Sequence, residues 1–210
     1  MKAWSAFYPD VLPDLPGAPL PMVDHWLRNA AIELCERSKA LVADLDLIDA
    51  VANQPGYELL MPTGSDLVEI TSAWFSGKKI TPKSPLYLDN HYEDWTAQVG
   101  TPEHYTQQGM DSVLLVPMPS ADSAGAIKIK AAIKPSATAT GVDDWLYAQF
   151  RKALAAGCKA GMMAMPGVAW ANPDRVTLNA GLFEAAVSDA MASATNGFTR
   201  AKPRFSGGFC

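Results

Sequence analysis

The sequence has few cysteines and no long apolar run, and each absence excludes a class of protein. Its 210 residues contain only three cysteines, Cys35, Cys158 and Cys210, and this odd number does not support a disulfide framework. We expect reduced thiols, with Cys35 and Cys158 as small core residues inside helices. No run approaches the ~18 consecutive apolar residues that a membrane-spanning helix needs, so we expect no membrane segment.

Basic residues are also in deficit. The chain carries 17 Lys and Arg against 22 Asp and Glu, which gives a formal net charge of -5 and a pI of about 5.1. A dedicated nucleic-acid binder needs clustered Lys and Arg for phosphate contacts. The composition therefore argues against sequence-specific DNA or RNA binding, although DNA could still pass nearby without adhering.

Residue patterns typical of catalysis or cofactor binding are missing as well. The three histidines, His25, His91 and His104, lack the spacing of a zinc site. The sequence contains no Gly-x-Ser-x-Gly elbow and no glycine-rich nucleotide loop. A Ser-His-Asp triad stays open as an alternative, because its members need not be adjacent in sequence. We expect no catalytic residue, no metal and no cofactor.

Apolar periodicity predicts three long helices. The first spans residues 21–45, and the other two span about 142–165 and 173–197, joined by a corner that Pro166 and Gly167 mark. Pro173 suits the first helical position, and Asp143 and Asp144 suit the first turn of the preceding helix. The last two helices predict an αα-hairpin.

Small residues form smooth strips on both helices of this hairpin. Gly157 and Gly161 lie on the first and Gly181 on the second. Glycine inside a helix costs ~1 kcal/mol relative to alanine, so close packing is the simplest reason for its presence. The partner could be the other helix of the hairpin or a neighbouring subunit, and the sequence does not separate these alternatives.

The middle of the chain alternates with the period of strands. We expect a hairpin of residues 67–75 and 78–81 around Ser76-Gly77, a short strand at 86–88, and strands at 103–106, 112–116 and 126–133. The last has isoleucines on one face and lysines on the other, as in an antiparallel sheet with one wet side. For residues 1–8 we expect a short turn of helix, and the proline-rich remainder up to Pro21 predicts an extended strap.

Together these elements predict an α+β fold in which the helices form a bundle and an antiparallel β-sheet subdomain is inserted. We assign residues 1–197 to one domain, with helical parts 21–45 and 141–197 and the β subdomain 46–140. Residues 198–210 are assigned to an extended C-terminal arm.

The arm is basic and aromatic, and its proline and glycines break any helix. Such a segment cannot build a core of its own and is suited to binding a partner, with aromatic anchors and charged contacts. The candidate partner-binding residues are Phe198, Arg200, Lys202, Arg204, Phe205 and Phe209.

Local patterns along nearly the whole chain resemble the head–tail adaptor proteins of tailed bacteriophages, including tail tubular protein A and gatekeeper-like adaptors. Each pattern is weak alone, and their order carries the resemblance. They are the helix from Trp26 to Ser38, Gln54-Pro55-Gly56-Tyr57, Pro62-Thr63-Gly64, residues 100–105, Pro117-Met118-Pro119, residues 135–138, and residues 155–157 through Pro166, Trp170, Pro173 and Phe183.

The resemblance implies a structural virion protein without enzymatic activity, made in the host cytoplasm. Such adaptors form a ring, usually of twelve copies, beneath the portal protein. The ring lines the DNA exit channel and recruits the next tail component, a nozzle or tail tube. The C-terminal segment docks on the portal in related adaptors. Two alternatives remain: another neck or tail-completion protein, or a small hydrolase or binding module with an unrecognised site.

Overall fold

The computed structural model describes residues 1–107, 109 and 111–196, without the side chains of residues 195 and 196. The chain divides into two compact units, which are considered separately. Unit 1 combines residues 1–40 with the chain from Val142 onward, and unit 2 comprises Leu41–Gly141.

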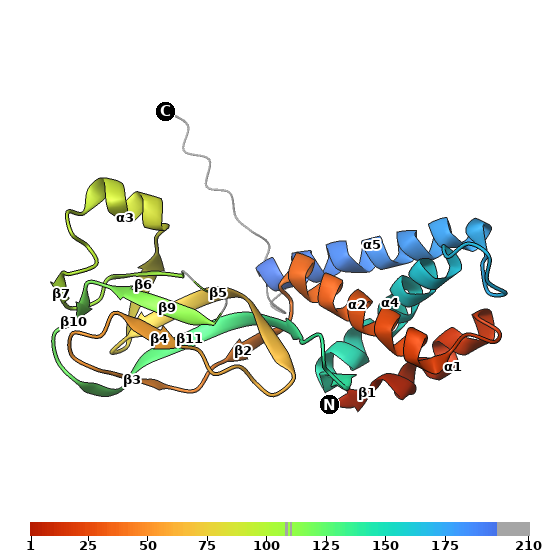
Figure 1. The fold of residues 1–210 in the computed structure, drawn as a ribbon, viewed down its shortest axis with the longest axis horizontal. Coiled ribbons are helices and arrows are strands. Elements are labelled where there is room, and N and C mark those ends of the chain that lie inside the picture. The colour runs from red at the N-terminus through yellow and green to blue at the C-terminus, as the bar shows by residue number, and fades with distance from the viewer. Residues whose placement is uncertain (108, 110, 197–210) are drawn as a thin grey trace. The chain divides into compact units, whose positions relative to one another are not determined.

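Unit 1 is mainly helical (Figure 1). Its elements are β1 (Lys2–Ala3), the 3-10 helix η1 (Trp4–Phe7), α1 (Tyr8–Val11), the 3-10 helix η2 (Leu12–Asp14), α2 (Leu20–Ser38), α4 (Asp144–Met163) and α5 (Pro173–Asn196). The predicted helical hairpin is therefore confirmed as α4 and α5. The side chain of Asp143 accepts a hydrogen bond from the Trp145 N–H and caps α4.

Two predictions for the N-terminal part are wrong. The proline-rich stretch is not an extended strap, because Pro9 and Pro13 occupy early positions of α1 and η2, where a missing N–H has no cost. The helix predicted for residues 21–45 ends at Ser38, because Lys39 adopts a left-handed conformation with φ of 54°. Residues 42–44 then enter the sheet of unit 2 as a strand.

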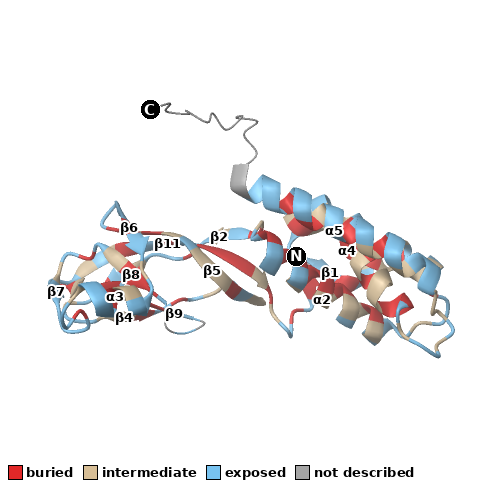
Figure 2. Ribbon diagram, turned by 90° about the horizontal axis from the view of Figure 1, so that it is seen from above, coloured by how far each residue is buried: buried red, intermediate tan, exposed pale blue. Residues whose placement is uncertain are grey.

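The core of unit 1 lies where α2, α4 and α5 meet. Fully buried leucines come from α2 and α4, and α5 contributes Phe183 and Val187 (Figure 2). Gly157 and Gly161 of α4 lie at this contact. A Cβ at Gly157 would approach Phe183 to 2.9 Å and Ala30 to 3.0 Å, and a Cβ at Gly161 would lie 2.3 Å from the Trp26 ring. Such distances leave no room for a side chain.

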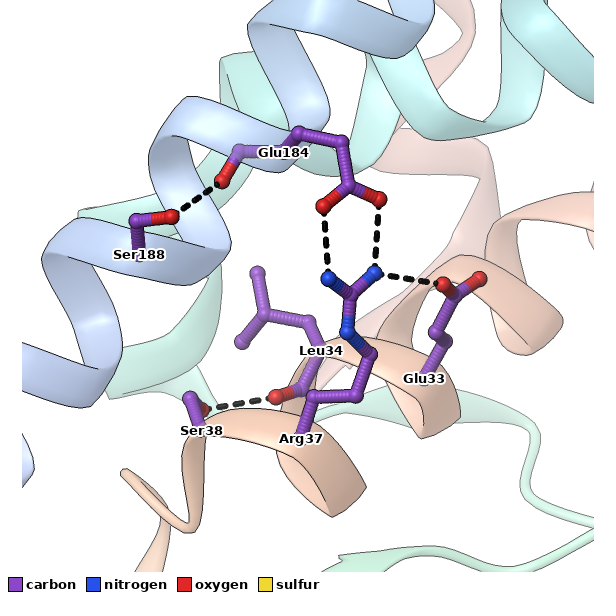
Figure 3. Close-up of polar contacts among 6 residues, drawn as sticks. All are labelled: Glu33, Leu34, Arg37, Ser38, Glu184 and Ser188. Carbon is purple, nitrogen blue, oxygen red and sulfur yellow. Dashed lines mark hydrogen bonds and ion pairs between the residues drawn. The ribbon is translucent and has the colours of Figure 1, made fainter.

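A guanidinium clamp joins α2 and α5 above this core (Figure 3). Arg37 donates two hydrogen bonds to the Glu184 carboxylate, at 2.7 and 2.5 Å, and one to Glu33 at 2.9 Å. These bonds raise the pKa of Arg37 and hold the pKa of Glu184 below its usual range. Because the clamp is exposed to solvent, screening limits its contribution to stability, and it supports rather than determines the position of α5 on α2.

Asp14 of η2 forms a second polar junction. It accepts hydrogen bonds from Lys159 at 3.0 Å and from Arg175 at 2.8 Å. The bond from Lys159 is the main reason that the pKa of Asp14 is lowered. This carboxylate thereby ties the N-terminal segment to both helices of the hairpin.

Unit 2 is built on an eight-stranded sheet. Its elements are β2 (Val42–Asp44), β3 (Ile48–Ala50), β4 (Gly56–Glu58), β5 (Ser65–Phe75), β6 (Lys78–Pro82), α3 (Pro85–His91), β7 (Val99–Gly100), β8 (His104–Thr106), β9 (Ser112–Val116), β10 (Met118–Pro119) and β11 (Ser123–Pro135). The strand order is β2-β11-β5-β6-β8-β9-β4, with β3 also paired to β11. Two small two-stranded sheets pair β7 with β10 and β1 with β12 (Gly141–Val142).

The predicted architecture, a helical bundle with an inserted antiparallel sheet, is wrong, although the fold does mix helices and strands. The sheet is large, curled and mixed, because β6 and β8 are parallel. The predicted strand at 86–88 is instead part of α3, which Ser84 caps and Pro85 begins. A helical crossover between β6 and β8 lets the chain return in the same direction, which a tight turn would prevent.

The longest pairing joins β5 and β11, from Phe75↔Ile127 to Ser65↔Pro135. Its register shifts twice, and at each shift β5 carries one extra residue, first Thr71 and then Val68. Such bulges bend a strand and increase its twist. The predicted hairpin between β5 and β6 is confirmed, with positive φ at Ser76 and Gly77.

We expect Gly161→Leu to lower the free energy of unfolding by about 1–3 kcal/mol, because the new side chain overlaps the Trp26 ring. Gly181→Ala is the matched control. A Cβ there meets nothing within 4 Å, so the better helix propensity should raise stability by up to ~1 kcal/mol. Chemical denaturation measures both, and unchanged stability of Gly161→Leu would show that this contact is not tight.

The lowered pKa of Asp14 predicts how the free energy of unfolding depends on pH. A carboxylate whose pKa is lower in the folded state stabilises the protein above its unfolded pKa, and this contribution is lost as the pH falls through the folded pKa. Asp14→Asn should therefore cost roughly 1 kcal/mol at neutral pH, after allowance for solvent screening, and progressively less as the pH falls below about 4. Denaturation at a series of pH values checks this, with the exposed Asp46→Asn as control. A difference between wild type and Asp14→Asn that stays constant down to pH 2 contradicts it.

Candidate interaction surfaces

The outward face of α5 exposes apolar and small residues along one stripe. Leu178 is 63% exposed and Leu182 is 55% exposed, and they are four residues apart on the helix. Gly181, Ala185 and Ala192 are exposed on the same side, and the exposed Asp189 lies between the last two. We call the five apolar and small residues the α5 stripe. The opposite face of the helix, with Phe183 and Val187, is buried in unit 1.

The three glycines selected from the sequence are not brought together. Gly157 and Gly161 face α2 and α5, in a groove of about 230 Å³ whose lining includes Trp26, Ala180 and Phe183. Gly181 lies in the α5 stripe and has open space around its Cβ position. Sequence reasoning did not select Leu178 and Leu182, although their spacing on a helix that already had an apolar face was a usable signal.

In unit 2, β6 is much shorter than its neighbour β5. Its ladder with β5 runs only from Phe75↔Lys78 to Ala73↔Ile80, and the strand ends at Pro82, which has no N–H to donate. Among the described residues, no strand pairs with residues 65–72 of β5 on this side. We call the open space beside these residues the β5 slot.

Two depressions lie along the β5 slot. One, of about 380 Å³, has a lining that includes Glu69 and Ile70 of β5, Tyr105 and Thr106 of β8, and Lys83 after β6. The Tyr105 hydroxyl donates a hydrogen bond across it to the Ile70 carbonyl, at 3.3 Å. Burial, reinforced by the negative charge of Glu69, raises the pKa of Tyr105. This hydroxyl therefore remains a neutral donor at neutral pH.

The second depression, of about 530 Å³, lies farther along β5 and is acidic. Its lining includes Ser65 and Asp66 of β5, Glu58 of β4, and Asp111 and Ser112 at the start of β9. It contains three carboxylates and no lysine or arginine. Strands and loops that are distant in sequence supply these carboxylates, so no local pattern could have revealed the site.

A small separate core holds α3 against the sheet of unit 2. Leu88, Trp95 and Val116 form it, with Tyr92 packed alongside. The Trp95 indole N–H donates a hydrogen bond to Asp89 at 2.7 Å. This cluster anchors the chain that crosses from β6 to β8, and thereby fixes the position of β8 at the β5 slot.

The cysteines and histidines have structural surroundings. Cys35 and Cys158 are fully buried, and desolvation raises the pKa of each thiol to about 12, which disfavours the nucleophilic thiolate. His104 is hydrogen-bonded to the hydroxyls of Thr81 and Tyr92, at 2.7 and 3.0 Å. His91 stacks on Tyr87, with ring centroids 4.0 Å apart.

The described part of the chain offers neither a metal site nor a membrane-spanning helix. No group of three or more His, Cys, Asp or Glu residues is arranged to hold a metal ion there. Within the same residues, no helix combines the length and apolar character that crossing a membrane requires.

The six candidate partner-binding residues of the C-terminal arm lie outside the described residues. They are Phe198, Arg200, Lys202, Arg204, Phe205 and Phe209. Their role stays a prediction.

Comparison with known proteins gives one result. No curated protein matches the chain, but the family model described as SU10 adaptor protein matches residues 5–205. This match covers both units and the greater part of the C-terminal arm. The chain therefore belongs to the SU10 adaptor protein family, which is a family of structural adaptors of bacteriophages.

Proposed function

We propose that this protein is a head-to-tail adaptor that forms a ring beneath the portal of the capsid and lines the DNA exit channel, in the manner of tail tubular protein A. The observation that carries the proposal is the family match over residues 5–205. Its role is structural, and its partners are other copies of itself, the portal protein and the next tail component.

Ring formation needs a surface that each copy presents to its neighbour. The α5 stripe is suited to this, because Leu178 and Leu182 expose apolar area that the fold of unit 1 leaves uncovered. Gly181 and Ala185 add no bulk, so a neighbouring element can approach the helix closely. In a ring of identical copies, this stripe contacts a different surface of the next subunit.

The charge of the protein is compatible with a channel for DNA. A formal net charge of -5 limits adhesion of phosphates. DNA would therefore pass through without sequence-specific binding. The C-terminal arm concentrates cations and phenylalanines, which fits it to dock on the portal.

The location is tested by electron microscopy of virions in which Cys210 carries an electron-dense label. We expect a ring of label at the one vertex where the tail joins the head. Label distributed over the shell, or absent from the particle, would overturn the proposal.

We expect Leu182→Glu to abolish ring formation while the monomer keeps its fold, because the introduced carboxylate would have to be desolvated in an apolar contact. Light scattering measures the mass of the assembly, and circular dichroism checks the fold. Ala148→Glu, on the exposed side of α4, is the control and should still assemble. Normal rings from Leu182→Glu would exclude the α5 stripe as the subunit contact.

Truncation after Gly197 tests the arm. The arm lacks the apolar periodicity of a core element, so we expect the shortened chain to keep its thermal stability. It should bind the portal at least about tenfold more weakly, as loss of roughly 1.4 kcal/mol would produce. Co-sedimentation with purified portal measures the affinity. If the truncated and complete chains bind equally, the arm is not the docking element.

A further inference from the structure

Part of the backbone edge of β5 has no strand partner. On the side of β6, its ladder stops at Ala73↔Ile80. Tyr105 of β8 reaches the Ile70 carbonyl, and the Ser65 N–H is bonded to the Pro62 carbonyl. Between these two contacts, residues 66–69 of β5 present a backbone edge that no described strand covers.

Uncovered edges of this kind accept an extended peptide through main-chain hydrogen bonds, while flanking side chains determine which peptide fits. The flanking carboxylates are Glu58, Asp66 and Asp111, with Glu69 at the Tyr105 end. Lys83 also lines that end, where its ammonium lies over the Tyr87 ring. The carboxylates select an extended segment with positive charges at regular intervals.

The chain itself contains such a segment outside the described residues. Residues 198–210 carry Arg200, Lys202 and Arg204 and no acidic residue. These three cations are spaced two residues apart, so in an extended conformation they all lie on one face. Pro203 lacks an N–H, and it is tolerated in an added strand where its nitrogen faces away from the ladder.

We propose that, in protein not bound to a portal, the C-terminal segment of one copy adds as a strand to the β5 slot of a second copy. Residues 200–203 pair with residues 66–69 of β5, and the three cations meet the carboxylates of the slot. The inference deepens the proposed function by naming a contact between copies that precedes portal docking, and it requires portal binding to withdraw the segment from the slot.

Direct binding tests the proposal without a portal. The protein is the complete chain carrying Arg200→Glu, Lys202→Glu and Arg204→Glu, so that its own segment does not compete. The probe is a fluorescent synthetic peptide of residues 198–210, and anisotropy measures binding. We expect saturable binding that weakens as salt increases. A scrambled peptide of the same composition should bind at least about tenfold more weakly, because it loses the alternation of cations.

The site is tested by charge reversal in the same protein. Asp66→Lys with Asp111→Lys should weaken peptide binding at least about tenfold. Asp46→Lys with Glu93→Lys makes the same change in net charge at exposed positions outside both depressions, and should leave the affinity within about twofold. Equal losses in both variants, or no binding at all, would overturn the proposal.

Dilution of the wild-type protein identifies the donor copy. If the segment comes from a second copy, dilution vacates the slots, and the peptide binds more readily per chain at low protein concentration. If the slot is blocked equally at every concentration, the donor is the same chain and the claim of exchange between copies fails. None of these measurements uses the portal. If the peptide does not bind the slot, the proposed adaptor function is unaffected. If the protein is absent from the virion, the measured peptide binding is unaffected.

Discussion

The close approach of α2 and α5 to two glycines of α4 determines the rest of unit 1. Trp26 lies over Gly161, and Phe183 lies against Gly157, at distances that no side chain in place of either glycine would allow. This packing sets where α5 runs. The solvent-exposed Arg37–Glu184 clamp follows from this packing, because the guanidinium can donate both hydrogen bonds to the carboxylate only when the two helices already have this spacing. Once α5 is fixed by one face, its other face is necessarily presented outward.

Unit 2 depends on a different constraint, the unequal lengths of β5 and β6. Pro82 ends the shorter strand, and Ser84 with Pro85 begins α3 almost at once. The chain then returns through the Leu88–Trp95–Val116 cluster to place β8 parallel to β6. Since β5 continues for several residues beyond the end of β6, the sheet has an opening within it. The same prolines that shape the turn therefore create the slot.

The helices could largely be predicted from the sequence, because their signals are local. Pro173 and Asp143 mark helix starts that the structure confirms, and the alternation of lysines and isoleucines correctly predicts β11. The predicted strand at residues 86–88 was wrong because the helix start signals just before it outweigh its strand propensity. Leu86, Tyr87 and Leu88 have strand propensity, yet Ser84 and Pro85 make them helical.

The size of the sheet and its mixed pairing could not be predicted, since they depend on contacts between distant segments such as β6 and β8. The β5 slot could not be predicted for the same reason. The exposure of Leu178 and Leu182 in the α5 stripe depends on which face of α5 packs on α2 and α4, and the sequence alone does not give that.

The two candidate surfaces differ in the kind of contact that they favour. The α5 stripe offers apolar area on a rigid helix, and burial of apolar area is insensitive to salt and nearly independent of direction. The β5 slot offers directional backbone groups flanked by carboxylates, and a contact of that type weakens as salt increases and can be exchanged for another basic strand. The proposed ring would have to hold its copies together while its other partners change during assembly. In that proposal the first surface serves the permanent contact and the second the exchangeable one, because only the second depends on charge and on backbone hydrogen bonds.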